Sequence, residues 1–276
     1  MSTFALREAC LAGGLAALIC VGMSGEVTAQ WITSVPDFSS DQVGWVAVGD
    51  LMPVPGKPSP VRQDPAHRYV PNNVGGQPTY RMGDLSNPNL KPWVKERMKK
   101  DNDEVLAGKI GYTARSSCAA AGVPGFLTYP VRPVYFIQTP KQVVMIYSGD
   151  AQVRRIYLNV PHSENSKPTW YGESVGHYEG DTLVVDTIGM NDKTFVDSYR
   201  TPHTAKLHVV ERWRMVEDGK ALEVTITVAD PDAFNEPWWG VRRYRRVLEK
   251  MGEEICAENN QHLFDYHIPV ASKPDF

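Results

Sequence analysis

Strand-like segments joined by tight turns dominate the sequence between residues 170 and 228. Strand-forming segments flank the turn Glu179–Asp181, and alternating apolar and polar residues flank Asp218-Gly219. An Asp-Gly pair between two alternating segments is a strong short-range signal for a β-hairpin, because both residues tolerate the positive φ angles of its turn. This part of the chain is therefore predicted to form antiparallel strands. Between them, Asn191–His208 is predicted to be a polar loop, where functional residues often gather.

Strand patterns continue on either side of this region. VYFIQ and VVMIYS flank a turn at Thr139–Lys141, VRRIYLN follows, and a last strand is expected over Trp238–Val247. About eight strands in sequence, mostly joined by short turns, favour an up-and-down barrel over alternating βαβ units. The predicted fold class is therefore all-β, an antiparallel up-and-down barrel spanning residues 116–276. An antiparallel β-sandwich is the alternative.

The segment before the barrel is irregular. Residues 30–115 are rich in proline and glycine, which exclude a long helix or a central strand over most of their length. We expect a Pro-rich N-terminal arm that wraps the barrel. One short helix is predicted near residues 88–107, where Pro88 or Pro92 suits the first helical turn and lysines and glutamates alternate with apolar positions.

The N-terminus has the pattern of a secretory signal peptide over residues 1–29. Arg7 lies in a short polar start, an apolar stretch Cys10–Met23 follows, and Val27–Ala29 supplies small residues for cleavage. The apolar stretch is shorter than the roughly 20 residues that span a bilayer. A retained membrane anchor is the alternative. The sequence predicts a periplasmic or secreted protein with no membrane span after signal removal.

Cysteine usage agrees with an oxidising compartment. Signal removal takes away Cys10 and Cys20 and leaves Cys118 and Cys256. Two remaining cysteines suggest one disulfide. Closing so long a loop is worth about 4–5 kcal/mol in the chain-entropy model. Two buried free thiols are the alternative.

Charge and motifs exclude several classes of function. The net charge is −3 with both signs interspersed, and no basic block marks a nucleic-acid surface. The arginines at 242–246 divide between two strand faces, which favours a solvated edge over a phosphate site. No phosphate loop or dinucleotide fingerprint is present, and no cofactor is predicted. His162, His177, His203 and His208 lie at no diagnostic metal spacing, so no metal is predicted either.

The second half of the chain resembles a family of secreted bacterial β-rich proteins over roughly Cys118–Cys256. The shared motifs are G-x-S-V-G-x-(aromatic)-E-G-D-T-L-V-V, P-H-(S/T), V-E-R, T-x-x-D-P and P-W. They lie here at Gly172–Val185, Pro202–Thr204, Val210–Arg212, Thr227–Pro231 and Pro237-Trp238. The resemblance implies export and a lipocalin-like barrel. It implies no activity and no catalytic residue.

Strand alternation gives one acid an inward position. Leu207, Val209, Trp213 and Met215 share a face with Glu211. A buried carboxylate is costly unless it is paired. Glu211 is therefore either a catalytic acid whose pKa is raised by burial, or half of a structural ion pair. Candidate partners from other strands are Arg132, Arg154, Arg243 and His177.

The loop Asn191–His208 supplies the other candidate catalytic groups. A histidine beside an aspartate is suited to general acid–base catalysis, because the carboxylate fixes the imidazole tautomer. His203 is the predicted proton carrier together with Glu211, and Asp197 or Asp192 is expected to orient it. Asp186, at the end of a strand that is apolar on both faces, is a further orienting candidate. A histidine that only hydrogen-bonds loop backbone is the alternative for His203. The Gly172–Gly176 letters match a serine-nucleophile elbow, but no helix follows them.

Aromatic residues are numerous enough to line a pocket. The predicted ligand-binding residues are Trp170, Tyr171, His177, Trp213, Trp238 and Tyr244. Small barrels hold one small ligand in this way, although ordinary core packing also explains such residues. The leading hypothesis is an exported protein that acts by acid–base chemistry on a small hydrophobic or cyclic molecule, as an isomerase, hydratase or lyase. The alternatives are a non-catalytic lipocalin-like carrier and an envelope interaction module that uses the arm.

Overall fold

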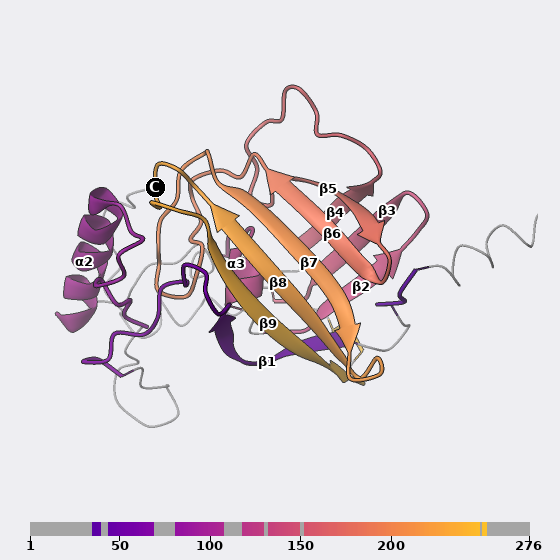
Figure 1. Ribbon diagram of the computed structural model, residues 1–276, viewed down its shortest axis with the longest axis horizontal. Helices are drawn as coiled ribbons and strands as arrows, with labels where there is room; N and C mark the ends of the chain where they lie inside the picture. The colour runs from indigo at the N-terminus through magenta and orange to yellow at the C-terminus, as the bar shows by residue number, and fades with distance from the viewer. Residues whose placement is uncertain are drawn as a thin grey trace, which may run out of the picture. The chain divides into compact units, whose positions relative to one another are not determined.

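Nine strands in the described part of the chain form a closed barrel, in the order β1 to β9 (Figure 1). The structure is a computed structural model, and it describes residues 35–39, 44–68, 81–107, 118–129, 132–149, 152–248 and 250–252. These residues belong to one compact unit, Val35–Phe276. The predicted signal peptide lies outside them. The strands are β1 Gly44–Pro53, β2 Val134–Gln138, β3 Gln142–Tyr147, β4 Gln152–Leu158, β5 Glu173–Glu179, β6 Thr182–Ile188, β7 His208–Val216, β8 Ala221–Ala229 and β9 Trp238–Val247.

The predicted all-β barrel is confirmed, with one difference in its topology. Neighbouring strands pair antiparallel around the barrel, except that β4 and β5 are parallel. Parallel neighbours cannot be joined by a tight hairpin and need a connection of a dozen or more residues. Residues 159–172 supply it. The barrel is therefore mixed, with a long crossover where an up-and-down barrel has a short turn.

The strand β1 lies inside the segment that the sequence predicted to be a wrapping arm. It pairs with β9 from Gly44↔Val247 onward and with β2 at Trp45↔Val134, and so closes the barrel. Its register shifts between Val48 and Met52, and Gly49 in this bulge has a φ of 69°. Bulges break strand alternation. Because of that break and the flanking prolines, the sequence pattern did not predict β1.

The predicted short helix is confirmed as α2, Pro92–Leu106, with proline in its first turn. Val94, Met98 and Val105 are buried along one side. The helix is tied to the segment before β9, because the Trp93 indole donates to the Asp232 carbonyl oxygen at 2.7 Å and the Lys91 amide donates to the Ala233 carbonyl oxygen at 3.0 Å. A second, one-turn helix, α3, covers Gly125–Thr128. Neither described helix is long and apolar enough to cross a bilayer.

Side chains fill the barrel interior. On β7, Val209, Glu211 and Trp213 point inward and are fully buried, while Arg212 is exposed on the outside, as strand alternation predicts. The inward aromatic rings contact one another across strands: Trp213 lies 5.4 Å from Phe136 and 5.6 Å from Tyr244, measured between ring centroids. The centre of the barrel is thus a packed core.

The loop between β6 and β7 packs against both helices. The Thr128 hydroxyl of α3 donates to the Val196 carbonyl oxygen at 2.8 Å, and the Thr201 hydroxyl contacts the Met98 sulfur of α2 at 3.6 Å. Val196 and Leu207 are buried. This loop therefore extends the hydrophobic core beyond the strands and is fixed on several sides.

Candidate functional site

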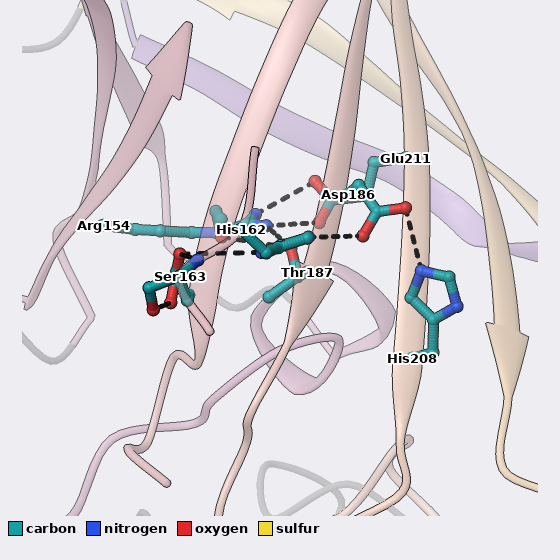
Figure 2. A network of polar contacts seen from close by, with 9 residues as sticks. Arg154, His162, Ser163, Asp186, Thr187, His208 and Glu211 are labelled. Atoms are coloured by element: carbon teal, nitrogen blue, oxygen red, sulfur yellow. Dashed lines mark hydrogen bonds and ion pairs between the residues drawn. The ribbon is translucent and has the colours of Figure 1, made fainter. Parts of the chain in front are cut away.

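Strand β6 carries polar groups on both faces of the barrel wall. Thr187 points inward and joins a buried cluster around Arg154 and Glu211, while Asp186 points outward and joins a half-exposed cluster with His162 and His208 (Figure 2). Successive residues of a strand alternate between its faces, so these two adjacent residues serve separate networks. The sequence predicted roles for Glu211 and Asp186, and the structure places them on opposite sides of the wall.

The inner network is a buried ion pair. The Arg154 guanidinium donates to the two carboxylate oxygens of Glu211 at 2.7 and 3.0 Å, and the Trp213 indole donates to the same carboxylate at 2.9 Å. The side chains of Arg154 and Glu211 are 3% and 0% exposed. Of the four partners that the sequence proposed for Glu211, Arg154 is the one that pairs with it.

The remaining donors of Arg154 are also engaged. They reach the Ser174 hydroxyl at 3.0 Å and the Thr187 hydroxyl at 2.7 Å, and the guanidinium lies over the Phe126 ring at 5.3 Å. Buried charges are stable only when such partners replace their lost water. The carboxylate of Glu211 is therefore fully used in structural contacts between strands and is not accessible to a substrate.

The outer network consists of one carboxylate shared by two histidines. Asp186 Oδ1 lies 2.8 Å from His162 Nε2, and Asp186 Oδ2 lies 2.9 Å from His208 Nε2. The side chains remain accessible, with 38% of Asp186, 22% of His162 and 43% of His208 exposed. Unlike the inner pair, this cluster can be reached by a molecule in solution.

Three different elements bring the outer cluster together. Asp186 pairs with Val210 across β6 and β7, and His208 lies two residues earlier on β7 and on the same outer face. His162 comes from the crossover between β4 and β5. The crossover is fastened by Glu173, which accepts hydrogen bonds from the Ser163 amide at 2.7 Å and from the Ser163 hydroxyl. The parallel pairing of β4 and β5 is thus what carries His162 to Asp186.

The electrostatics of the cluster favour a charged carboxylate and a basic imidazole. Burial raises the pKa of the Asp186 carboxyl, but hydrogen bonds from His208 and His162 outweigh burial and hold that pKa below its usual value. The hydrogen bond to Asp186 in turn raises the pKa of His208 against partial burial. Because an ionised carboxylate only accepts hydrogen bonds, both histidines must donate Nε2–H to it.

This arrangement leaves one imidazole nitrogen available for chemistry. With Nε2 of His208 protonated, Nδ1 carries the lone pair of the neutral ring. Within the described residues, no group hydrogen-bonds His208 Nδ1, and the side chain is nearly half exposed. His162 differs, because its Nδ1 is buried and lies 3.7 Å from Glu173 Oε1. His208 is therefore the residue of the cluster with an accessible basic nitrogen, Nδ1.

Removing the charge of Asp186 is expected to lower the pKa of His208. In Asp186→Asn the imidazole loses the carboxylate that stabilises its protonated form, so its titration by NMR shifts to lower pH. A folded-state pKa above about 6.5 means that the Asp186–His208 contact stabilises the fold fully below that pH. The stabilisation is lost as the pH rises through the raised pKa. His177, which contacts Glu179 instead at 3.0 Å, provides the internal control. An unchanged His208 titration would contradict the assigned role of Asp186.

His203 and Asp197 lie in the packed loop and do not hydrogen-bond each other. His203 Nδ1 lies 2.9 Å from the Thr204 carbonyl oxygen, and its Nε2 lies 2.9 Å from the Thr194 hydroxyl. Nδ1 must therefore be the donor and Nε2 the acceptor of the neutral ring. Burial lowers the pKa of His203, which disfavours the charged form. Both ring nitrogens are thus engaged inside the loop.

Asp197 fixes the conformation of the same loop. Its carboxylate accepts hydrogen bonds from the Tyr199 amide at 2.8 Å, the Thr201 amide at 3.2 Å and the Thr201 hydroxyl at 2.7 Å. Burial raises the pKa of this carboxyl to about 6, although these hydrogen bonds act in the opposite direction. Its partners are all loop groups, with no contact to His203 among them.

The predicted ligand-binding residues do not converge on one surface. Trp213 and Tyr244 pack against each other inside the barrel with tilted rings, and Trp238 packs against Phe234 with ring centroids 6.3 Å apart. Tyr171 packs against Phe126, Trp170 is half-buried, and His177 is exposed on the outer face of β5. Trp213, Tyr244 and Trp238 are at most 2% exposed. Of the predicted disulfide, Cys118 is described and Cys256 lies outside the described residues, so the pairing stays a prediction.

Sequence patterns did not connect Asp186 with its two histidines. His162 and His208 were considered in the sequence only for metal spacing, and no metal was predicted. The described residues contain no group of three or more histidine, cysteine, aspartate or glutamate side chains arranged to hold a metal. The geometry explains this, because both Nε2 atoms face carboxylate oxygens of Asp186. An outward polar residue in the otherwise apolar segment TLVVDTI was the available signal.

Comparisons with protein-family models, with curated proteins and with solved structures found no match to this chain.

Proposed function

We propose that the protein is a periplasmic or secreted acid–base catalyst, of the isomerase, hydratase or lyase type, with its site on the outer wall of the barrel. The observation that carries the proposal is the carboxylate of Asp186, which accepts Nε2–H from two histidines and leaves Nδ1 of His208 open. A positioned imidazole with a pKa near the working pH is an effective general base. The carboxylate stabilises the imidazolium that forms when His208 takes a proton.

The neighbourhood of the cluster suits a largely apolar substrate. Tyr157, Val175, Asp186 and Val210 form one row across the outer faces of β4 to β7. Tyr157 and Val160 are both nearly half exposed. Two strand spacings separate Tyr157 from Asp186, about 10 Å between backbones. A small cyclic molecule lying on Tyr157 would therefore place a reacting atom near the histidines.

The packed interior supports an outer site over an inner one. A closed barrel is compatible with a lipocalin-like ligand-binding role, and a carrier needs a cavity within the strands. Here the side chains of Leu222, Val224 and Ile226 point inward and are 0% exposed, so none of them borders a space that admits water. The exposed Asp186 cluster can be reached from solution without a cavity inside the barrel.

A general proton-abstraction probe tests the proposal. The probe is a nitro-substituted benzisoxazole, a small aromatic molecule from which a base removes the ring C–H proton. The electron pair then forms the nitrile, the N–O bond breaks, and the coloured phenolate leaves. Wild-type protein should accelerate this reaction over buffer, with a rate that rises with pH through the raised pKa of His208, since the neutral imidazole is the base. His208→Gln should lose about a hundredfold or more of that acceleration.

Two variants make the test specific. Asp186→Asn should retain part of the acceleration and shift its pH profile toward lower pH, because the imidazole becomes a weaker base. His177→Gln, which removes another exposed histidine from the same outer wall, should leave rate and profile unchanged. Equal losses in His177→Gln and His208→Gln, or full acceleration by His208→Gln, would exclude His208 as the base.

A further inference from the structure

A second polar feature lies where β9 meets the bulge of β1, away from the Asp186 cluster. Arg242 points inward from β9 and is 5% exposed. Its guanidinium donates to the Gly49 carbonyl oxygen in the bulge, and to the Thr128 carbonyl oxygen at the end of α3 at 2.7 Å. These contacts place a cation in the wall of the barrel, between β1 and α3.

Within the described part of the chain, Arg242 forms no ion pair, although the charge of Asp50 is near enough to favour its protonated form. Among the described residues, no carboxylate oxygen lies within the 4.0 Å that defines an ion pair with Arg242, although seven other arginines of the described chain form such pairs. A guanidinium has five N–H donors, and the described residues offer it two acceptors, both backbone carbonyls. Its Nε–H is buried without a partner. Burial lowers the pKa of Arg242, in keeping with a cation removed from water.

A second arginine approaches the same two segments. Arg81 Nη1 lies 3.6 Å from Asp50 Oδ1, and the Arg81 guanidinium lies over the Tyr129 ring at 5.7 Å. Asp50 directly follows Gly49, and Tyr129 directly follows Thr128. The two guanidinium groups are near enough to interact, because the charge of Arg81 acts on Arg242 and lowers its pKa further, after burial. Arg81 also hydrogen-bonds Tyr199. Burial raises the pKa of Tyr199, so the Tyr199 hydroxyl stays neutral and able to donate.

We infer that Arg242 and Arg81 form a binding site for a small oxyanion, a carboxylate or a phosphate, at this junction of β1, α3 and the β6–β7 loop. Two cations held close together repel each other, and an anion between them reverses that cost. Guanidinium N–H groups match carboxylate and phosphate oxygens in geometry as well as charge. Arg81 is 31% exposed, which leaves the site a side open to solvent.

A purely structural role accounts for only part of this arrangement. Arg242 does hold the β1 bulge against α3 through two carbonyl oxygens. That role uses two of its five N–H donors and needs no second arginine beside it. Asp50 is the nearby acid, but it is 88% exposed and lies beyond hydrogen-bond distance of Arg81. It can therefore turn toward water when an anion enters.

Thermal unfolding of the intact protein in defined salts tests the inference. Sodium phosphate and sodium acetate are each titrated against sodium chloride at equal ionic strength and pH. We expect one or both oxyanions to raise the Tm along a saturating curve, as mass action requires of a ligand that binds only the folded state. The anion with the lower apparent Kd identifies the class, phosphate or carboxylate. Stabilisation no greater than that of chloride by either anion would overturn the inference.

Matched arginine variants locate the effect. Arg81→Gln should weaken the apparent Kd about tenfold or more, the usual effect of losing one charge-assisted hydrogen bond. Arg81 is partly exposed, so this variant is expected to fold. Arg242→Gln should abolish the response if it folds, and Arg245→Gln, on the outer face of the same strand, should leave it within about twofold. An unchanged Kd in Arg81→Gln, or an equal loss in Arg245→Gln, would remove the site from this junction.

Discussion

Replacing Glu211 with glutamine is expected to destabilise the fold by about 3–5 kcal/mol, the usual result of breaking a buried ion pair by removing one partner. The variant keeps the shape of the side chain but leaves Arg154 as a buried cation without a counterion. One amide oxygen replaces two charged oxygens, and the amide nitrogen faces donors on Arg154. The Trp213 indole N–H also competes for that single acceptor.

Denaturant unfolding of four proteins isolates the pair: wild type, Glu211→Leu, Arg154→Met and the double variant. Each single change should be severely destabilising, and the double variant should recover a large part of the loss, because neither charge is then buried alone. The residual deficit reflects the unpaired indole of Trp213. Arg212→Met removes the neighbouring arginine of β7, which contacts Glu179 on the surface at 2.6 Å, and should have little effect. Near wild-type stability in Glu211→Gln would contradict the buried pairing.

Replacing Asp197 with asparagine is expected to increase the stability of the protein relative to wild type as the pH rises. The pKa of Asp197 is raised from 3.8 to about 6 by burial, so the folded protein binds a proton that the unfolded chain has already released between these values. When folding raises the pKa of an acid, the stability of the protein is highest below the pKa of the unfolded state. It then falls as the pH rises toward the pKa of the folded state. The difference corresponds to about 3 kcal/mol above pH 6.

Asparagine preserves the hydrogen bonds of Asp197 and cannot ionise. Its amide oxygen can accept from the Tyr199 and Thr201 amides, while its amide nitrogen donates to the Thr201 hydroxyl. The free energy of unfolding of Asp197→Asn minus that of wild type should therefore increase by about 2.5 kcal/mol between pH 4 and pH 8. Asp192→Asn, an exposed change in the same loop, is the control. A difference that does not vary with pH would mean that Asp197 is not buried as a titrating acid.

Strand alternation predicted much of the barrel because short hairpins make local pattern and tertiary structure coincide. Asp218-Gly219 joins β7 and β8, and the Thr139–Lys141 turn joins β2 and β3. The parallel pairing of β4 with β5 was not predictable in this way, because a crossover leaves no hairpin signature. Likewise β1 was missed, since the bulge at Gly49 interrupts its alternation.

The candidate site was predicted only where strand geometry determines it. Alternation placed Glu211 inside and included Arg154 among its partners. Loops offer no such rule, so the proximity of His203 and Asp197 in sequence did not translate into a hydrogen bond. The pairing of Asp186 with His162 depends on the path of the crossover, which sequence periodicity does not describe.

The pairing of β1 with β9 joins the two ends of the barrel sequence, Gly44 with Val247. The pairing of β1 with β9 is expected to form late in folding. It brings together the most distant segments of the barrel, and the chain loses the most entropy before their contacts compensate for it. Until β9 has been synthesised, β8 has no outer neighbour and exposes the open edge on which sheets aggregate. A growing chain can thus assemble its internal hairpins early, but it gains a sheet without edges only when its final strand arrives.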